Sequence, residues 1–116
     1  MEKKLIHIKW LEPIYFSNNI TNHKAVKSKL ERGAALIEYY VIVLSDKDDE
    51  ELLIYPAREF KMHHMKDKEF IGVGIAKGFH AAEVLVAKIA KESYKKTGDC
   101  HLKEYLLEKA NMEDLK

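Results

Sequence analysis

The chain has 116 residues, of which 47% are hydrophobic and 34% charged, and its formal net charge is +1. This length predicts one domain, residues 1–116, with enough chain to bury a single core. The composition excludes an intrinsically disordered chain, and the balanced charge argues against a nucleic-acid partner. No apolar run approaches the ~20 residues of a membrane-spanning helix, so a membrane partner is not expected.

Cysteine usage and the first residues bear on the compartment. Cys100 is the only cysteine, so the chain has no internal disulfide, which fits a reducing environment. His7 and Lys9 interrupt any signal-peptide core in the apolar residues that follow the first lysines. We therefore expect a cytoplasmic protein.

The first element is expected to be a strand. Residues 5–10 alternate between apolar and polar side chains, which is typical of a strand with one buried face. Pro13 is expected to end or bend this strand, and residues 14–16 to continue it as a short edge piece.

A helix is expected next, because Thr21 or Asn22 can cap it and Gly33 can stop it after Arg32. Its apolar side is thin and its outer side is basic. We expect a helix on the surface of the domain.

A hairpin is predicted in the middle of the chain. Residues 34–44 form a strand that is apolar on both faces, and such strands are usually covered on both sides. Residues 45–50 form a polar loop, and residues 51–55 return as the second strand. Pro56 stops that strand or starts a helical turn, and residues 57–67 are expected to form a short helix followed by a loop.

The stretch from Glu69 to Gly98 predicts a strand, a turn and the longest helix of the chain. Residues 70–76 form the strand, with two alternating sets of side chains on opposite faces: Ile71, Val73 and Ile75, against Phe70, Gly72, Gly74 and Ala76. Glycines on a strand leave room for a close neighbour. Gly78 then begins the turn into the helix.

The helix is expected over residues 79–96, because apolar side chains recur at helical spacing, namely Ala82, Leu85, Val86 and Ile89. Leu85, in the middle of this stripe, should be fully buried against the sheet. Gly98 is a natural helix terminator. Asp99 is expected to cap a last helix whose apolar face includes Leu102 and Leu106.

The order of elements is strand, helix, strand, strand, short helix, strand, helix, helix. It predicts an α+β fold: a mostly antiparallel sheet of about four strands, with the helices packed mainly on one face as a two-layer sandwich. A ferredoxin-like fold would need a further strand after the long helix.

One candidate ligand site precedes the long helix. The free N–H groups of a first helical turn attract anions, and Lys77 lies beside them, so Lys77, Gly78, Phe79 and His80 could bind a phosphate- or nucleotide-type ligand. A dinucleotide-binding turn is a poorer match, because Gly72 and Gly74 fall inside the strand.

No catalytic residue, metal site or cofactor is predicted. The pairs His63–His64 and Cys100–His101 are adjacent, which is not the spacing that converges on a metal. The acidic run at residues 46–51 lacks the glycine and the final glutamate that a calcium loop requires. These absences favour a protein that is not an enzyme.

Three runs together resemble a group of small bacterial proteins of unknown function: IGVGIAKGFHAAEVLVAKI, TGDCHLKEYL and YYVIVLSDKDDEELLIYP. The resemblance covers most of the chain beyond Ile14. It implies one compact cytoplasmic domain and supplies no active site.

The sequence therefore favours a non-catalytic domain that acts through protein–protein interaction or self-association. Residues 34–44 and the long helix carry more apolar surface than the thin helices can cover, and such surface usually marks an interface. A two-fold homodimer is the commonest way to bury it. The alternative is a monomer in which Trp10, residues 14–16 and residues 60–65 cover the strand.

Overall fold

The computed structural model describes residues 8–33, 37–47, 50–61, 68–99 and 101–114. The elements along the chain are β1 (Ile8–Phe16), α1 (His23–Glu31), β2 (Tyr39–Leu44), β3 (Leu52–Pro56), the 3-10 helix η1 (Ala57–Lys61), β4 (Phe70–Lys77), α2 (Phe79–Thr97) and α3 (Leu102–Asp114). This order confirms the predicted α+β fold. None of the described helices has the length and apolar character needed to cross a bilayer.

The four strands form one mixed sheet in the order β1-β4-β2-β3. β2 runs antiparallel to both β3 and β4, so the sheet is mostly antiparallel, as predicted. β1, at one edge, runs parallel to β4. Strand β4 lies inside the sheet, which explains why its sequence is apolar on both faces.

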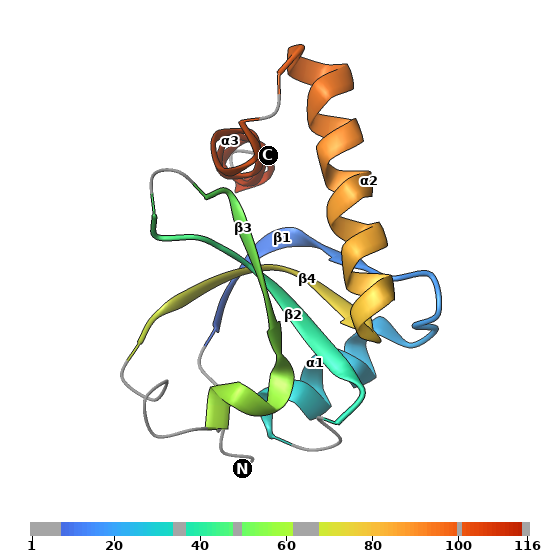
Figure 1. The fold of residues 1–116 in the computed structure, drawn as a ribbon. Coiled ribbons are helices and arrows are strands. Elements are labelled where there is room, and N and C mark those ends of the chain that lie inside the picture. The colour runs from blue at the N-terminus through green and yellow to red at the C-terminus, as the bar shows by residue number, and fades with distance from the viewer. Residues whose placement is uncertain (1–7, 34–36, 48–49, 62–67, 100, 115–116) are drawn as a thin grey trace.

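Helices lie on both sides of this sheet (Figure 1). The two long helices, α2 and α3, share one face, where Leu85, Ile89 and Leu106 pack against the sheet. α1 and η1 lie on the other face, where Leu30 and Phe60 are buried. The long helices are on one face as predicted, but the second face is covered too.

That second face is closed in part by residues of the monomeric alternative, whereas Tyr15 packs on the α2 side and residues 62–65 lie outside the described residues. Trp10, Ile14, Phe16 and Phe60 all pack in the core beneath α1 and η1. The apolar surface of the sheet is therefore covered within one chain.

Strand β2 is buried on both faces, as predicted, and it begins later than predicted. Val41, Ile42 and Val43 are each at most 1% exposed. Ile37 is 81% exposed and lies with Glu38 in a turn, so the expectation of a strand at these two positions was wrong; residues 34–36 lie outside the described residues. Tyr39 pairs with Lys77, the last residue of β4. Beyond this pair the Gly78 N–H still donates to the Glu38 carbonyl at 2.8 Å, but both segments then leave the sheet.

The alternation predicted for β4 is broken by a bulge. Val43 and Ile42 are consecutive in β2, yet they pair with Gly72 and Gly74, which leaves Val73 as an extra residue in β4. A Cβ at Gly72 would contact the Trp10 side, whereas a Cβ at Gly74 would contact Leu85 on the α2 side. The prediction that both glycines share one face was therefore wrong.

Strand β1 continues through Pro13, and its paired residues jump from Trp10 to Tyr15 at this point. An edge strand tolerates proline because its outer N–H groups need no partner. The predicted residues before Ile8 lie outside the described residues.

Most helix ends lie at the residues that the sequence predicted. Asn22 caps α1, and its side-chain oxygen accepts a hydrogen bond from the Ala25 N–H at 3.0 Å. Gly98 ends α2 in a left-handed conformation with φ of 80°. Asp99 is not the cap of α3, because the first helical hydrogen bond runs from Tyr105 to the His101 carbonyl; Asp99 instead accepts the His101 N–H at 3.2 Å.

Candidate functional site

The predicted ligand-binding residues lie where β4 passes into α2. Lys77 is the last residue of β4, Gly78 has φ of 107°, and Phe79 and His80 open the helix. A φ of this size is unfavourable for residues with a side chain, and Gly78 has nothing within 4 Å of where a Cβ would lie. No side chain caps this helix, and its first turn contains no acidic residue.

The side chains of these residues do not converge. Lys77 lies 3.9 Å from the Glu38 carboxylate, and the 90% exposed His80 side chain lies 3.8 Å from Glu83. Phe79 packs edge-on against Tyr40, with 5.6 Å between ring centroids. None of the four predicted residues lines the apolar cleft at Ser17 or the polar cleft at the α2–α3 connection. The ligand site at the start of α2 stays a prediction.

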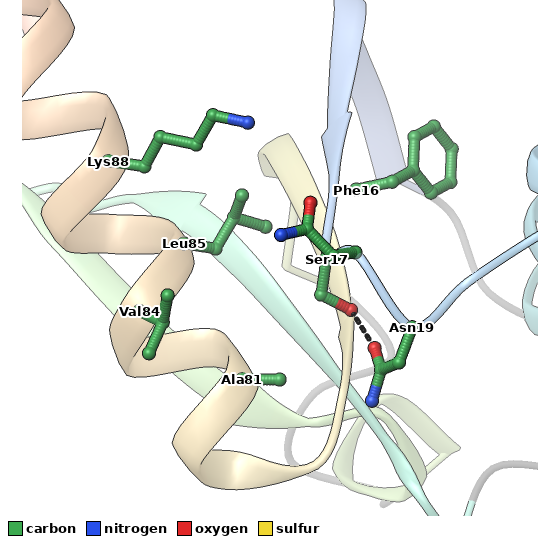
Figure 2. Close-up of a pocket in the computed structure, with 8 residues that line it drawn as sticks. Phe16, Ser17, Asn19, Ala81, Val84, Leu85 and Lys88 are labelled. Carbon is green, nitrogen blue, oxygen red and sulfur yellow. Dashed lines mark hydrogen bonds between the residues drawn. The ribbon is translucent and has the colours of Figure 1, made fainter.

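A mainly apolar cleft of about 200 Å³ begins one residue further along α2 (Figure 2). It lies between the first turns of α2 and the turn that follows β1. Its lining residues are Phe16, Ser17, Asn18, Asn19, Ala81, Val84, Leu85 and Lys88. Leu85, 3% exposed, belongs to the core, while Val84 is 53% exposed. The cleft is therefore an opening onto the core beside an exposed helix face.

Hydrogen bonds hold the turn on the other side of this cleft. The buried Ser17 hydroxyl donates to Asn19 Oδ1 at 2.6 Å and accepts the Lys77 N–H at 3.1 Å. The Asn19 side-chain amide donates to the Lys77 carbonyl at 2.9 Å. The Ser17 N–H donates to the Ile75 carbonyl at 3.1 Å. Because both sides are anchored to β4, the cleft is pre-formed.

The solvent-facing side of α2 consists of two parallel stripes. One, which we call the aromatic stripe, contains Phe79, Glu83, Ala87, Ala90 and Tyr94 at helical repeats. The other, the lysine stripe, contains Val84, Lys88, Lys91 and Lys95 and borders the cleft. Phe79 is 51% exposed and Tyr94 62% exposed. Sequence reasoning noted the wide apolar arc of this helix but did not separate the stripes.

A polar cluster joins β1, α2 and α3 away from the cleft. Glu92 Oε2 accepts hydrogen bonds from the Tyr15 hydroxyl, from the Tyr105 hydroxyl at 2.6 Å and from Lys109 Nζ at 3.0 Å. Lys109 Nζ also lies 2.8 Å from the Tyr15 hydroxyl oxygen and 4.8 Å from the centre of that ring. Three elements are thus connected through one carboxylate oxygen.

The cluster shifts the ionisation of its members. Burial raises the pKa of Tyr15 above its ordinary value, and the hydrogen bond to Glu92 adds to this. Loss of solvent and the same carboxylate raise the pKa of Tyr105 to about 12. Burial alone would raise the pKa of Glu92, but the hydrogen bonds from Tyr105, Tyr15 and Lys109 outweigh it and lower that pKa. At neutral pH Glu92 is ionised and both tyrosines are protonated.

Sequence reasoning missed this cluster, although α3 contained a signal. The apolar positions Leu102, Leu106 and Ala110 define the buried side of α3, and Lys109 falls on the border of that side. A lysine there needs a carboxylate partner. Glu92 is the only Asp or Glu in the second half of α2.

Of the four cluster residues, Tyr105 also lines a second cleft, whereas Tyr15, Glu92 and Lys109 line neither that cleft nor the apolar one. The second cleft lies by the α2–α3 connection and is lined by Thr97, Asp99, His101, Glu104, Tyr105 and Glu108. No group of three or more His, Cys, Asp or Glu among the described residues could hold a metal ion. His63, His64 and Cys100 lie outside those residues.

Comparison of the chain with protein-family models, with curated proteins and with solved structures finds no match. The resemblance to small bacterial proteins stays a prediction. What the protein does must therefore be argued from its surfaces.

Proposed function

We propose that this protein is a non-catalytic interaction domain of the cytoplasm that acts as a homodimer, with the aromatic stripe of α2 as the interface. The observation that carries the proposal is the exposure of Phe79 and Tyr94 at the two ends of one stripe. Single exposed apolar residues are ordinary on protein surfaces. Here two aromatic side chains are aligned on the longest helix of the chain.

The stripe suits packing between two helices. Ala87 and Ala90 are small, so the axis of a second helix can approach closely at the centre of the stripe. Phe79 and Tyr94 then lie at the two ends of the contact. A two-fold axis at Ala87 makes the two copies of α2 antiparallel. Phe79 of one copy then lies near Tyr94 of the other.

The buried sheet changes the basis of this proposal. The sequence favoured a dimer because residues 34–44 and the long helix carry more apolar surface than the thin helices were expected to cover. In the structure α1, η1 and Trp10 cover the sheet face that this excess included. The dimer therefore rests on α2 alone. An interface formed by one helix from each copy is small, which predicts an equilibrium between monomer and dimer.

Light scattering coupled to size exclusion tests this form of the proposal. At tens of micromolar protein we expect roughly twice the chain mass, falling towards the monomer mass on dilution. Tyr94→Glu should give the monomer mass at every concentration, because it buries a charge in the interface. Thr21→Glu, an equal change of charge at an exposed position outside α2, should leave the mass unchanged.

A monomer mass for the unmodified protein at tens of micromolar would contradict the dimer. A dimer that persists in Tyr94→Glu would contradict the assigned interface and leave the dimer itself standing.

A second candidate function is binding of a phosphate- or nucleotide-type ligand at Lys77, Gly78, Phe79 and His80. The observation that favours it is the start of α2 without a side-chain cap, on a glycine with open space beside it. An anion there would accept hydrogen bonds from N–H groups of the first turn. Glu38, 3.9 Å from Lys77, opposes it by supplying negative charge.

Thermal unfolding with inorganic phosphate, ATP and phosphorylated sugars tests this candidate. A ligand at 100 times its dissociation constant stabilises a domain by about 2.7 kcal/mol, which is a readily measured shift in melting temperature. We expect the shift to disappear in Lys77→Gln and to persist in Lys91→Gln, a matched change on the same helix. A clean transition that none of these compounds moves would contradict the candidate.

A further inference from the structure

We propose that the cleft beside the lysine stripe binds an acidic segment of another protein, which inserts one large apolar side chain between α2 and the turn at Ser17. This inference rests on the role of the protein as an interaction domain and does not require its dimeric form. It names the chemical class of the partner for a surface that would stay exposed in a dimer formed through the aromatic stripe.

The cleft fits a single apolar anchor. Its α2 side consists of Ala81, Val84 and Leu85, which offer only carbon atoms from their side chains, as Figure 2 shows. The volume of about 200 Å³ has room for a leucine or phenylalanine side chain. Interfaces gain most of their affinity from a few anchors of this kind, whose burial on binding excludes water.

The opposite side of the cleft does not need to reorganise when the anchor enters. Ser17 and Asn19 are held to the end of β4 by side-chain hydrogen bonds of 2.9 to 3.1 Å, to the Lys77 N–H and the Lys77 carbonyl. A pre-formed site loses less conformational entropy on binding than a mobile one.

The charge of the lysine stripe selects an acidic partner. Lys88 lines the cleft, and Lys91 and Lys95 continue away from it, so the stripe from Val84 extends about 16 Å along the helix. Among the described residues, no carboxylate forms an ion pair with any of these three lysines. A segment with its apolar side chain in the cleft can therefore place carboxylates beside them.

A symmetric second copy fits this surface poorly, because it would place lysine stripe against lysine stripe. Single-stranded nucleic acid fits poorly as well, since it requires aromatic rings on which bases stack. Phe16 is the one aromatic residue that lines the cleft, but its ring points away from α2 (Figure 2) and stacks on His23 at 3.9 Å between ring centroids. A protein segment remains the occupant that uses both the apolar walls and the charges.

Fluorescence anisotropy with synthetic peptides tests the proposal. The probes are labelled ten-residue peptides of Asp, Glu and Ser with one central leucine or phenylalanine. Two control peptides replace either the central apolar residue with serine or every acidic residue with lysine. We expect binding of the acidic, anchored peptides, at least a tenfold loss without the anchor, and no binding of the lysine peptide.

Variants of the protein locate the bound peptide. Val84→Glu and Lys88→Glu should each weaken binding at least tenfold, whereas Lys24→Glu, an equal charge reversal on α1, should not change it. Because all three positions are at the surface, circular dichroism should show the same folded state for each. The elution mass of these variants should match that of the unmodified protein. A loss of peptide binding can then be separated from a loss of dimerisation.

The proposal is overturned if the acidic peptides fail to bind at millimolar concentration, or if binding is the same with serine in place of the anchor. It is also overturned if Val84→Glu and Lys88→Glu bind like the unmodified protein. Tighter binding of a labelled oligothymidylate than of any acidic peptide would identify the surface as a nucleic-acid site instead.

Discussion

Glu92 makes the docking of α3 dependent on pH. Its carboxylate is stabilised in the folded state, so its folded pKa lies below its ordinary value of 4.5. The stability that it contributes is complete above pH 4.5 and is lost as the pH falls through the lower folded pKa. We expect the free energy of unfolding to decrease over this acid window, measured by urea denaturation at successive pH values.

Glu92→Gln isolates this contribution. The amide cannot attract Lys109 as a charge, so we expect a loss of about 1–3 kcal/mol at pH 7 and a flatter acid profile than that of the unmodified protein. Glu108→Gln, a change on the exposed side of α3, should preserve the original profile. Equal acid profiles for the protein and Glu92→Gln would show that other carboxylates control acid unfolding.

The same cluster limits stability at the alkaline end. The pKa of Tyr105 is raised from 10.0 to about 12, so the folded state favours the protonated phenol. That contribution is complete below pH 10.0 and is lost as the pH rises towards 12.

Gly72 and Gly74 should respond differently to the same substitution. A Cβ at Gly72 would lie 2.6 Å from both Ile8 and the Trp10 ring, so these side chains must move, and Gly72→Ala should cost about 1–3 kcal/mol. At Gly74 the nearest atom, on Leu85, is 3.2 Å away, and a smaller loss is expected. Urea midpoints of the two variants measure the difference. Equal midpoints would contradict the packing of Trp10 against β4.

The bulge in β4 could not be predicted from periodicity. A strict alternation assigns Gly72 and Gly74 to one face, and nothing in the local sequence indicates that Val73 is an extra residue. The register is set by Val43 of β2 and Trp10 of β1, which are distant in the chain. Only the long-range pairing contains this information.

The helix α2 shows how far an element can be predicted. Its apolar spacing and Gly98 located it correctly, and Leu85 is buried as expected. Leu85→Ala should therefore cost about 2–5 kcal/mol through lost burial and the cavity left behind. Val84→Ala, one residue away and largely exposed, should cost less than about 1 kcal/mol. Similar urea midpoints for the two variants would contradict the orientation of the helix.

The edges of elements were less predictable. The apolar residues before Tyr39 favoured a longer β2, but a strand ends where its neighbours end, and Lys77 is the last partner that β4 provides. The candidate ligand residues were located correctly at the start of α2. Their side-chain directions, with His80 towards solvent and Phe79 towards Tyr40, depend on the packing of the whole helix.

At the scale of the whole molecule, the class of the fold was predictable and the coverage of the sheet was not. The order of elements indicated an α+β domain because each element has a clear periodicity. The second face is covered where Trp10 and Phe60 pack with Leu30 of α1, and these residues are distant from one another in the chain. The cleft could not be predicted either. The turn at Ser17 reaches α2 only because β1 pairs with β4, and this pairing joins segments that are distant in the chain.

The parallel pairing of β1 with β4 has a consequence for synthesis. Ile8 pairs with Phe70, so β1 receives its neighbour in the described sheet only after the segment up to β4 has been made. At about 5–20 residues per second, the segment between these strands takes on the order of 3 to 10 s to translate. During that interval Trp10 has no strand to pack against. We therefore expect the nascent chain to expose Trp10 to chaperones that bind aromatic segments until β4 has been made, whereas in the finished domain Trp10 packs in the core.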